Sequence, residues 1–408
     1  MSPRRVSARS LIGLNAANFF QAEMIGVVLP VLNAYLREAH WRYDAIGVAT
    51  AAGGLGALIF QTPAGIITDS VRQRRLLFAV TAIVTGICFG SIPLLPHSYM
   101  WIDSLLFVSE AAGTLFVPLL AALALALVGH DRLSGVMGTN QGWNHAGNIA
   151  AALGAMAVVS FFGLASVFYA VAMSSMLAMM AVFVIREDDL DEHAATGLTS
   201  LEDRPVKWTV LLRDQTVLFL FISIFLFHFA NAPILPTVAL YVKQLGGSDR
   251  LMTATVLTAQ SVMVPVSLFA GRYCQRWGRK PVMAIAFWAL PLRILSYAYV
   301  TSPKSVVWLQ CLDGIGAGIY GVAVVAMAAD LTHGRGRFNT MMGVFASALA
   351  VGGVIGPLVT GVLVQRVGFQ RTFYVFATLA LLSAVVFSAL VPETKDQGSP
   401  VVEEGVAA

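Results

Sequence analysis

Three carboxyl groups stand deep inside long apolar stretches of the sequence: Glu23, Glu110 and Asp313. Each lies about ten residues or more from the start of its stretch, or roughly 15 Å along a helix that rises about 1.5 Å per residue. A charge at that depth in a bilayer costs about 2.5–3.5 kcal/mol, so such acids are candidates for function. A carboxyl group removed from water holds a proton more readily, because its charged form loses hydration. These acids are therefore predicted to take up and release protons.

Hydrogen-bonding side chains accompany the acids in the same apolar stretches. We predict that they bind a small solute, and the set consists of Asn18, Gln21, Asn144, His145, His228, Asn231 and Arg293. Arg293 leaves two interpretations open, because it can bind an anionic solute or only neutralise Asp313. Each histidine can likewise be a packing residue rather than a ligand.

The stretches that carry these residues have the length of membrane-spanning helices. Of the 408 residues, 57% are hydrophobic and 12% are charged, whereas a soluble domain carries roughly 25% charged residues. Runs of about 20 apolar residues predict an all-α integral membrane protein rather than a barrel of alternating strands. Twelve spans are expected, at residues 11–36, 45–69, 75–95, 99–128, 133–160, 163–185, 216–241, 251–275, 281–301, 303–330, 338–364 and 369–391.

A polar stretch divides the spans into two groups of six. It predicts an N-terminal half at residues 1–186, a solvated cytoplasmic linker at 187–214, a C-terminal half at 215–392 and a cytoplasmic tail at 393–408. The acidic run from Glu187 to Glu192 could hold a metal ion, but such a run is more typical of a solvated surface. Cys88, Cys274 and Cys311 have neither metal-ligand nor disulfide spacing. We therefore expect no metal and no cofactor.

Basic residues indicate which side of the membrane each loop faces. With the N-terminus inside, most of the 26 Lys and Arg residues fall in inside segments, as the positive-inside rule requires of cytoplasmic loops. Both termini are therefore predicted in the cytoplasm. The same loops account for the pI near 9.0, so no nucleic-acid partner is expected. The first apolar run is too long for a signal peptide and is expected to be the first spanning helix.

The two halves repeat each other. Leu29-Pro30 matches Leu235-Pro236, Gly65 matches Gly271, and Glu110 matches Asp313, at offsets between 203 and 206 residues. Several matches in order indicate duplication of a six-helix unit. Halves related in this way place a substrate site between them, near the middle of the bilayer.

Two loops at matching places in the repeat carry a further signal. One reads Gly65-Ile-Ile-Thr-Asp69-Ser-Val-Arg72-Gln-Arg74-Arg75, and the other runs from Gly271 to Lys280 with Gln275 in place of the acid. Through these motifs the chain resembles the major facilitator superfamily over essentially its whole length. The resemblance implies that the loops latch the outward-facing state, with Asp69 pairing with basic side chains across the interface of the halves. The gating residues that it implies are Gly65, Asp69, Arg72, Arg75, Gly271, Arg276 and Arg279.

The resemblance implies a secondary transporter of the bacterial efflux type, a monomer in the inner membrane, with a small-molecule substrate and protons as its partners. We predict proton-coupled export of a small organic solute by alternating access. The alternative is a proton-coupled uptake symporter for an organic anion or nutrient, in which Arg293 and the histidines would bind the anion. No enzyme is expected, because the spans contain no HExxH, GxSxG or DDxxD motif.

Overall fold

The computed structural model describes residues 6–25, 28–95, 98–199 and 204–395, and within them the chain is helical and contains no strand. Nine helical segments among these residues are long and apolar enough to cross a membrane. This confirms the predicted all-α membrane architecture, and the count of twelve spans stays a prediction. Residues 396–408 of the predicted tail lie outside the described residues.

In the first half, the described residues form seven helical segments. They are α1 (Ala8–Ile25), α2 (Val28–Glu38), α3 (Tyr43–Ser70), α4 (Arg74–Ser91), α5 (Tyr99–Gly113), α6 (Phe116–Phe162) and α7 (Ala165–Phe183). The apolar segment that joins α5 and α6 is 64 residues long, or roughly 96 Å as one straight helix, about three times the thickness of a hydrocarbon core. It is divided at Gly129, whose φ of +69° is open to glycine at little cost. Two passes therefore share this segment.

The second half follows a linker that holds only short helical turns: η1 (Glu187–Asp189), η2 (Ala194–Thr196) and α8 (Trp208–Leu211). Its long helices are α9 (Gln215–Asn231), α10 (Ile234–Gln244), α11 (Asp249–Trp277), α12 (Arg279–Tyr297), α13 (Pro303–Thr332) and α14 (Phe338–Leu390). α14 is divided at Gly368, where φ is +80°, as α6 is divided at Gly129.

A Leu-Pro pair follows the helix break in the second half. α9 ends at Asn231 and α10 begins at Ile234, and Pro236 is the third residue of α10. Proline has no N–H with which to continue the hydrogen-bond ladder of a preceding helix, but it fits the first turn of a new one. The matching pair of the first half, Leu29-Pro30, lies in the first turn of α2 as the structure describes it.

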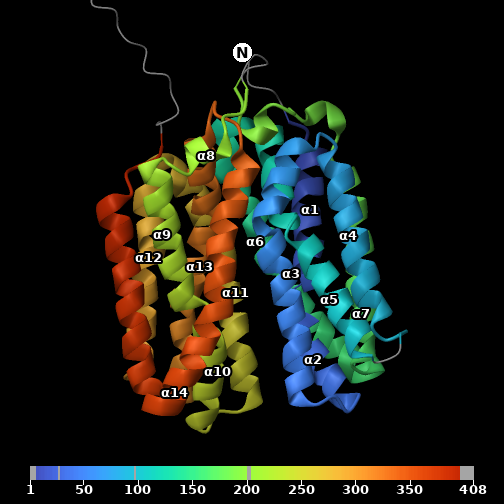
Figure 1. Cartoon of the computed structure of the whole chain (residues 1–408), viewed down its shortest axis with the longest axis vertical. Helices are drawn as coiled ribbons and strands as arrows, with labels where there is room; N and C mark the ends of the chain where they lie inside the picture. Colours follow the sequence, from blue (N-terminus) through green and yellow to red (C-terminus); the bar gives the residue numbers. More distant parts are fainter. Residues whose placement is uncertain (1–5, 26–27, 96–97, 200–203, 396–408) are drawn as a thin grey trace, which may run out of the picture.

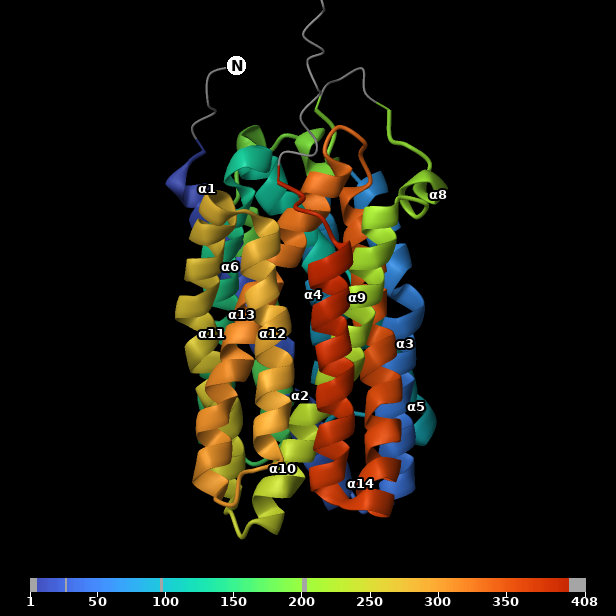
Figure 2. The ribbon, with the colours of Figure 1, turned by 90° about the vertical axis from the view of Figure 1, so that its left-hand side faces the viewer.

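The halves stand side by side and meet along few helix pairs (Figure 1). α3 packs against α14, and α6 packs against α11 and α13. The main contacts of α2 are with α1, α3 and α7, and those of α10 are with α9, α11, α13 and α14, so each stays within its own half. We call the end of the bundle at which α1 begins and the linker lies, at the top of Figures 1 and 2, the linker end.

The linker packs against both halves at the linker end. The Asp191 amide donates to the Ala126 carbonyl of the first half at 3.0 Å. The Ala195 carbonyl accepts from Asn339 Nδ2 of the second half at 3.0 Å, and Ala195 is fully buried. The linker is therefore anchored to both bundles through backbone groups, and its assignment as a solvated cytoplasmic linker stays a prediction.

Candidate functional site

A cavity of about 470 Å³ lies between the two halves. Its first-half wall is rich in amides, contributed by Asn18 and Gln21 of α1, Gln61 of α3, and Asn140, Gln141, Asn144 and Asn148 of α6. Its second-half wall is mostly apolar, with Val324 and Val325 of α13 and Met342, Phe345 and Leu349 of α14. Cavities of this size accommodate small organic ligands. One polar and one apolar wall suit an amphipathic molecule.

The amides on the polar wall form a connected network. Asn18 Nδ2 donates to Asn140 Oδ1 at 2.6 Å, and Asn144 Nδ2 donates to Asn18 Oδ1 at 2.8 Å. Asn18 and Asn140 are buried, and their mutual hydrogen bonds remove the cost of leaving buried polar groups unpaired. α1 and α6 are thereby held in fixed register, with Gln21, Gln141 and Asn148 beside the cavity.

Glu110 is the acid that lines this cavity, and it projects from α5. Within the described part of the chain, its carboxyl group has no hydrogen-bond or ion-pair partner. A Cβ atom added to Gly53 of α3 would lie 3.1 Å from Glu110 Cγ, so this glycine lets α3 approach the acid closely. Among the described residues that line the cavity, Glu110 alone carries a formal charge. The arrangement provides one carboxyl group, able to bind a proton, beside the cavity.

Asp69 joins the halves at the linker end. It lies in the last turn of α3, and its carboxylate accepts four hydrogen bonds at the start of α14. The donors are the Asn339 amide at 3.1 Å, Asn339 Nδ2 at 2.9 Å, the Thr340 amide at 2.8 Å and Thr340 Oγ1 at 2.6 Å. An anion at a helix N-terminus is favoured by the free amides and the helix dipole.

The position of Asp69 agrees with its predicted place across the interface, but the predicted partners are corrected. They are neutral donors rather than basic side chains. The sequence could not reveal this, because Asn339 and Thr340 lie 270 residues away along the chain. In the sequence, the clearest signal for Asn339 and Thr340 as anion-binding residues is that they directly follow residue 338, where a span is expected to begin.

Glycines allow the backbones of the two halves to touch. A Cβ atom on Gly65 would overlap the Asn339 carbonyl and lie 3.0 Å from Thr340 Cα. A Cβ atom on Gly138 would lie 2.8 Å from Gly271 Cα, which joins α6 to α11. Added Cβ atoms at these positions would push the two halves apart. Gly65 and Gly271, both in the predicted gating set, therefore lie at close contacts between the halves.

A second polar cluster lies at the linker end around Asp330, at the end of α13. Buried Arg279 donates to it from Nε at 3.1 Å, and His130 Nε2 from the first half lies 2.7 Å from its Oδ1. The His333 ring lies against the His130 ring, with centroids 4.4 Å apart and the ring planes tilted by 39°. Burial, together with the charge of His130, lowers the pKa of His333 below its ordinary value. The closed linker end therefore favours neutral His333.

The model of the Major Facilitator Superfamily matches residues 11–283 and 220–406, which together cover nearly all of the sequence. The chain belongs to this superfamily. An uncharacterized MFS-type transporter of Mycobacterium tuberculosis strain H37Rv is 33% identical over 400 residues, or 96% of this chain and 95% of that protein. The multi-drug resistance efflux pump PmrA of Streptococcus pneumoniae is 24% identical over 91% of this chain and 92% of its own.

Solved structures of the superfamily have the same fold. The proton:xylose symporter XylE, bound to 6-bromo-6-deoxy-D-glucose, matches with a TM-score of 0.71 and 13% identity over 95% of this chain and 96% of its own. The human organic anion transporter MFSD10 (TETRAN) matches with a TM-score of 0.72 and 15% identity over 93% of this chain and 99% of its own. At such low identity these structures establish the fold alone. Together with the family match, they make this chain a multi-pass membrane protein of a transporter family.

Four of the predicted site residues meet at the cavity of this superfamily member: Asn18, Gln21, Glu110 and Asn144. The cavity also includes residues that the sequence did not single out as ligands. Gln61, Tyr320 and Phe345 are among these lining residues. An isolated glutamine or aromatic residue in an apolar span gives no signal of which way it faces, so these residues could not be selected from sequence.

Other predicted residues lie away from the cavity lining. Glu23 accepts a hydrogen bond from Ser174 Oγ of α7 at 3.2 Å, inside the first half. His145 Nδ1 lies 2.9 Å from Gln260 Oε1, where α6 meets α11. His228 is buried and lies edge-on to Tyr320, with ring centroids 4.6 Å apart. Roles of these residues in proton or substrate binding stay predictions.

Arg293 and Asp313 form an ion pair between α12 and α13. Arg293 Nη2 also donates to Asn231 Oδ1, and all three residues line a separate void of only about 10 Å³. Arg293 and Asp313 are 4% and 15% exposed at their side chains. This geometry agrees with the interpretation that Arg293 neutralises Asp313, and the void is too small for an organic solute.

Single and double substitutions test whether the Arg293–Asp313 pair serves the stability of the fold or transport. Arg293→Met or Asp313→Leu alone leaves one buried charge unpaired, which costs about 3–5 kcal/mol. Each single variant is therefore expected to unfold at a lower temperature, whereas the double variant recovers stability because no charge remains. Thermal unfolding of the purified protein measures this. A stable double variant that has lost transport would instead assign the pair to proton or substrate binding.

The remaining predicted gating residues all lie at the linker end. Arg75 pairs with Glu187, and Arg279 pairs with Asp330 at 3.1 Å. Arg72 and Arg276 are exposed. Among the described contacts of the predicted set, those of Gly65, Asp69 and Gly271 reach the opposite half, and a gating role for the arginines stays a prediction.

Proposed function

We propose that this protein exports a small amphipathic organic compound in exchange for protons, by alternating access, with Glu110 as the proton carrier. The observation that carries the proposal is the position of Glu110 beside the cavity between the halves. A proton and a solute that compete for one cavity can be exchanged, because each binds best when the other is absent.

The lining of the cavity indicates which class of solute it favours. Its polar wall offers amides, its other wall is apolar, and no Lys, Arg or His is among its described lining residues. An ionised Glu110 repels an anion and attracts a cation. These features favour a cationic or neutral amphipathic solute over the organic anion of the alternative symport function. Relatives that include a multi-drug resistance efflux pump also favour export.

The distribution of basic residues supports a cytoplasmic location of the linker end in a bacterial cell. Most of the 26 Lys and Arg residues fall on that side, as expected for cytoplasmic loops. Because the hydrogen bonds of Asp69 close that end, the conformation corresponds to an outward-facing state. Protons then reach Glu110 from outside the cell and release the solute there.

Proteoliposomes test this function directly. Purified protein is reconstituted, a pH gradient is imposed, and uptake of lipophilic cations, neutral amphiphiles, sugars and organic anions is measured against protein-free vesicles. We expect amphipathic cations or neutral amphiphiles to move against the proton flow, and anions not to move. Movement of any solute in the same direction as protons would contradict exchange and favour symport.

A further inference from the structure

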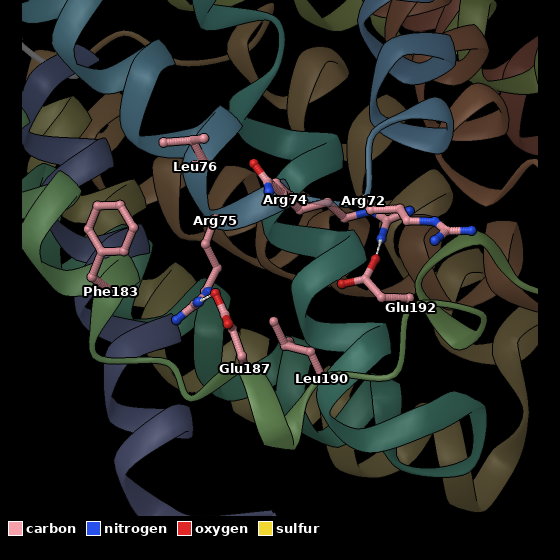
Figure 3. A pocket seen from close by; sticks show the side chains of 9 residues that line it. Arg72, Arg74, Arg75, Leu76, Phe183, Glu187, Leu190 and Glu192 are labelled. Carbon is pink, nitrogen blue, oxygen red and sulfur yellow. Dashed lines mark hydrogen bonds and ion pairs between the residues drawn. The ribbon is translucent and has the colours of Figure 1, made fainter.

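A second cavity, of about 490 Å³, lies at the linker end outside the interface of the halves. It is bordered by the loop before α4, the end of α7 and the start of the linker (Figure 3). Its lining includes three arginines, Arg72, Arg74 and Arg75, together with Glu187 and Glu192. The exchange proposed at Glu110 makes no direct use of these groups, although Arg72 and Arg75 belong to the predicted gating set.

The three arginines differ in how firmly they are held. Arg74 is 4% exposed, pairs with Glu192 and donates from Nε to the Thr68 carbonyl at 3.2 Å. These contacts occupy its guanidinium group, so it does not serve as a ligand-binding residue. Arg75 pairs with Glu187, whose side chain is 81% exposed. A pair with so exposed a partner contributes little and is readily exchanged. Arg72 is exposed and has no ionic partner among the described residues. Arg72 is therefore available to an anion. Arg75 is 15% exposed and also donates from Nη1 to the Ile185 carbonyl, so it offers Nη2 to an anion that displaces Glu187.

The same cavity has an apolar side. Leu76 and Phe183 are 49% and 47% exposed and, in Figure 3, lie on the side away from Glu192. Leu76 is in the first turn of α4 and Phe183 is the last residue of α7, and both helices are long and apolar enough to span a membrane. The cavity therefore straddles the boundary between the hydrocarbon and the aqueous phase, where lipid headgroups lie.

From this geometry we infer that the cavity binds a phosphate group through Arg72 and Arg75, in competition with Glu187. Arginine forks bind phosphate oxygens in paired, charge-assisted hydrogen bonds. Basic pockets between spanning helices at the cytoplasmic face accept anionic lipid headgroups. The phosphate can belong to an anionic phospholipid, whose chains would lie along Leu76 and Phe183, or to a soluble phosphate. The inference holds whatever solute the transporter carries.

Binding to the full-length purified protein tests the site. Native mass spectrometry measures the affinity for phosphatidylglycerol and phosphatidylcholine, and calorimetry measures the affinity for inorganic phosphate. Wild type is expected to prefer phosphatidylglycerol. Arg72→Gln is expected to weaken binding roughly tenfold, because one of two charge-assisted contacts is lost. Glu187→Gln is expected to tighten binding, because the competing carboxylate is gone.

Arg132→Gln is the matched control, since Arg132 is exposed on α6 and does not line this cavity. It should leave the affinity unchanged. Phe183→Ser separates the two sources, because it should weaken lipid binding while leaving inorganic phosphate binding intact. Binding of inorganic phosphate alone, lost in Arg72→Gln, supports the site with a soluble ligand. Equal affinities in wild type, Arg72→Gln and Glu187→Gln, or no binding of either probe, would overturn the inference.

Discussion

Replacing Glu110 by glutamine is expected to reduce proton-driven transport to background while leaving the fold intact. Glutamine has nearly the same shape as glutamic acid but cannot ionise, so the cavity loses its proton-binding group. Because the Glu110 carboxyl has no partner among the described residues, no folded-state hydrogen bond is broken. The unfolding temperature should therefore stay close to that of wild type.

Two measurements isolate the proton step. Transport driven by a pH gradient should vanish in Glu110→Gln, whereas exchange of labelled for unlabelled solute without a gradient should continue. Glu23→Gln provides the comparison, because Glu23 contacts Ser174 away from the cavity lining. The sequence alone predicts equal losses for both acids, and the structure predicts the larger loss at Glu110. Normal gradient-driven transport in Glu110→Gln would remove it as the proton carrier.

Gly65→Ala is expected to prevent the linker end from closing. The added methyl group would overlap the backbone carbonyl of Asn339, and a backbone obstacle cannot move aside by changing a rotamer. Overpacking of this kind costs about 1–3 kcal/mol, and a bias of that size shifts an equilibrium between two states roughly 5–150-fold. The outward-facing state should lose population, and transport should slow accordingly.

The matched control is Gly54→Ala on the same helix. A Cβ atom at Gly54 would have no neighbour within 4 Å, so transport should be unaffected. Opening can be followed by labelling a cysteine placed at Ser347, whose hydroxyl lies 2.7 Å from that of Thr62 in the opposite half. Faster labelling from the linker end in Gly65→Ala is the expected result. Unchanged labelling with a monodisperse, folded protein would show that the glycine does not control closure.

The long helices follow from the sequence. A bilayer demands about 20 apolar residues per pass, so spans stand out as blocks, and those expected at 45–69 and 303–330 match α3 and α13 to within two residues. The break between α9 and α10 was not predicted, since residues 216–241 were expected as one span, although Pro236 lies just after it. Gly65 and Gly271 lie where backbones of the two halves approach closely, and their gating role stays a prediction.

Tertiary structure alone decided which buried polar groups share the cavity. Glu110 and Asp313 are matched in the repeat and at similar depth, yet Glu110 lines the cavity while Asp313 pairs with Arg293. Position along a helix gives depth, but the direction in which a side chain points depends on the rotation of the helix and on its neighbours. The partners of Asp69, at Asn339 and Thr340, likewise come from the other half. Thus the sequence determined that protonatable groups lie within the apolar spans, and the packing of the two halves determined that Glu110 is the one that lines the cavity.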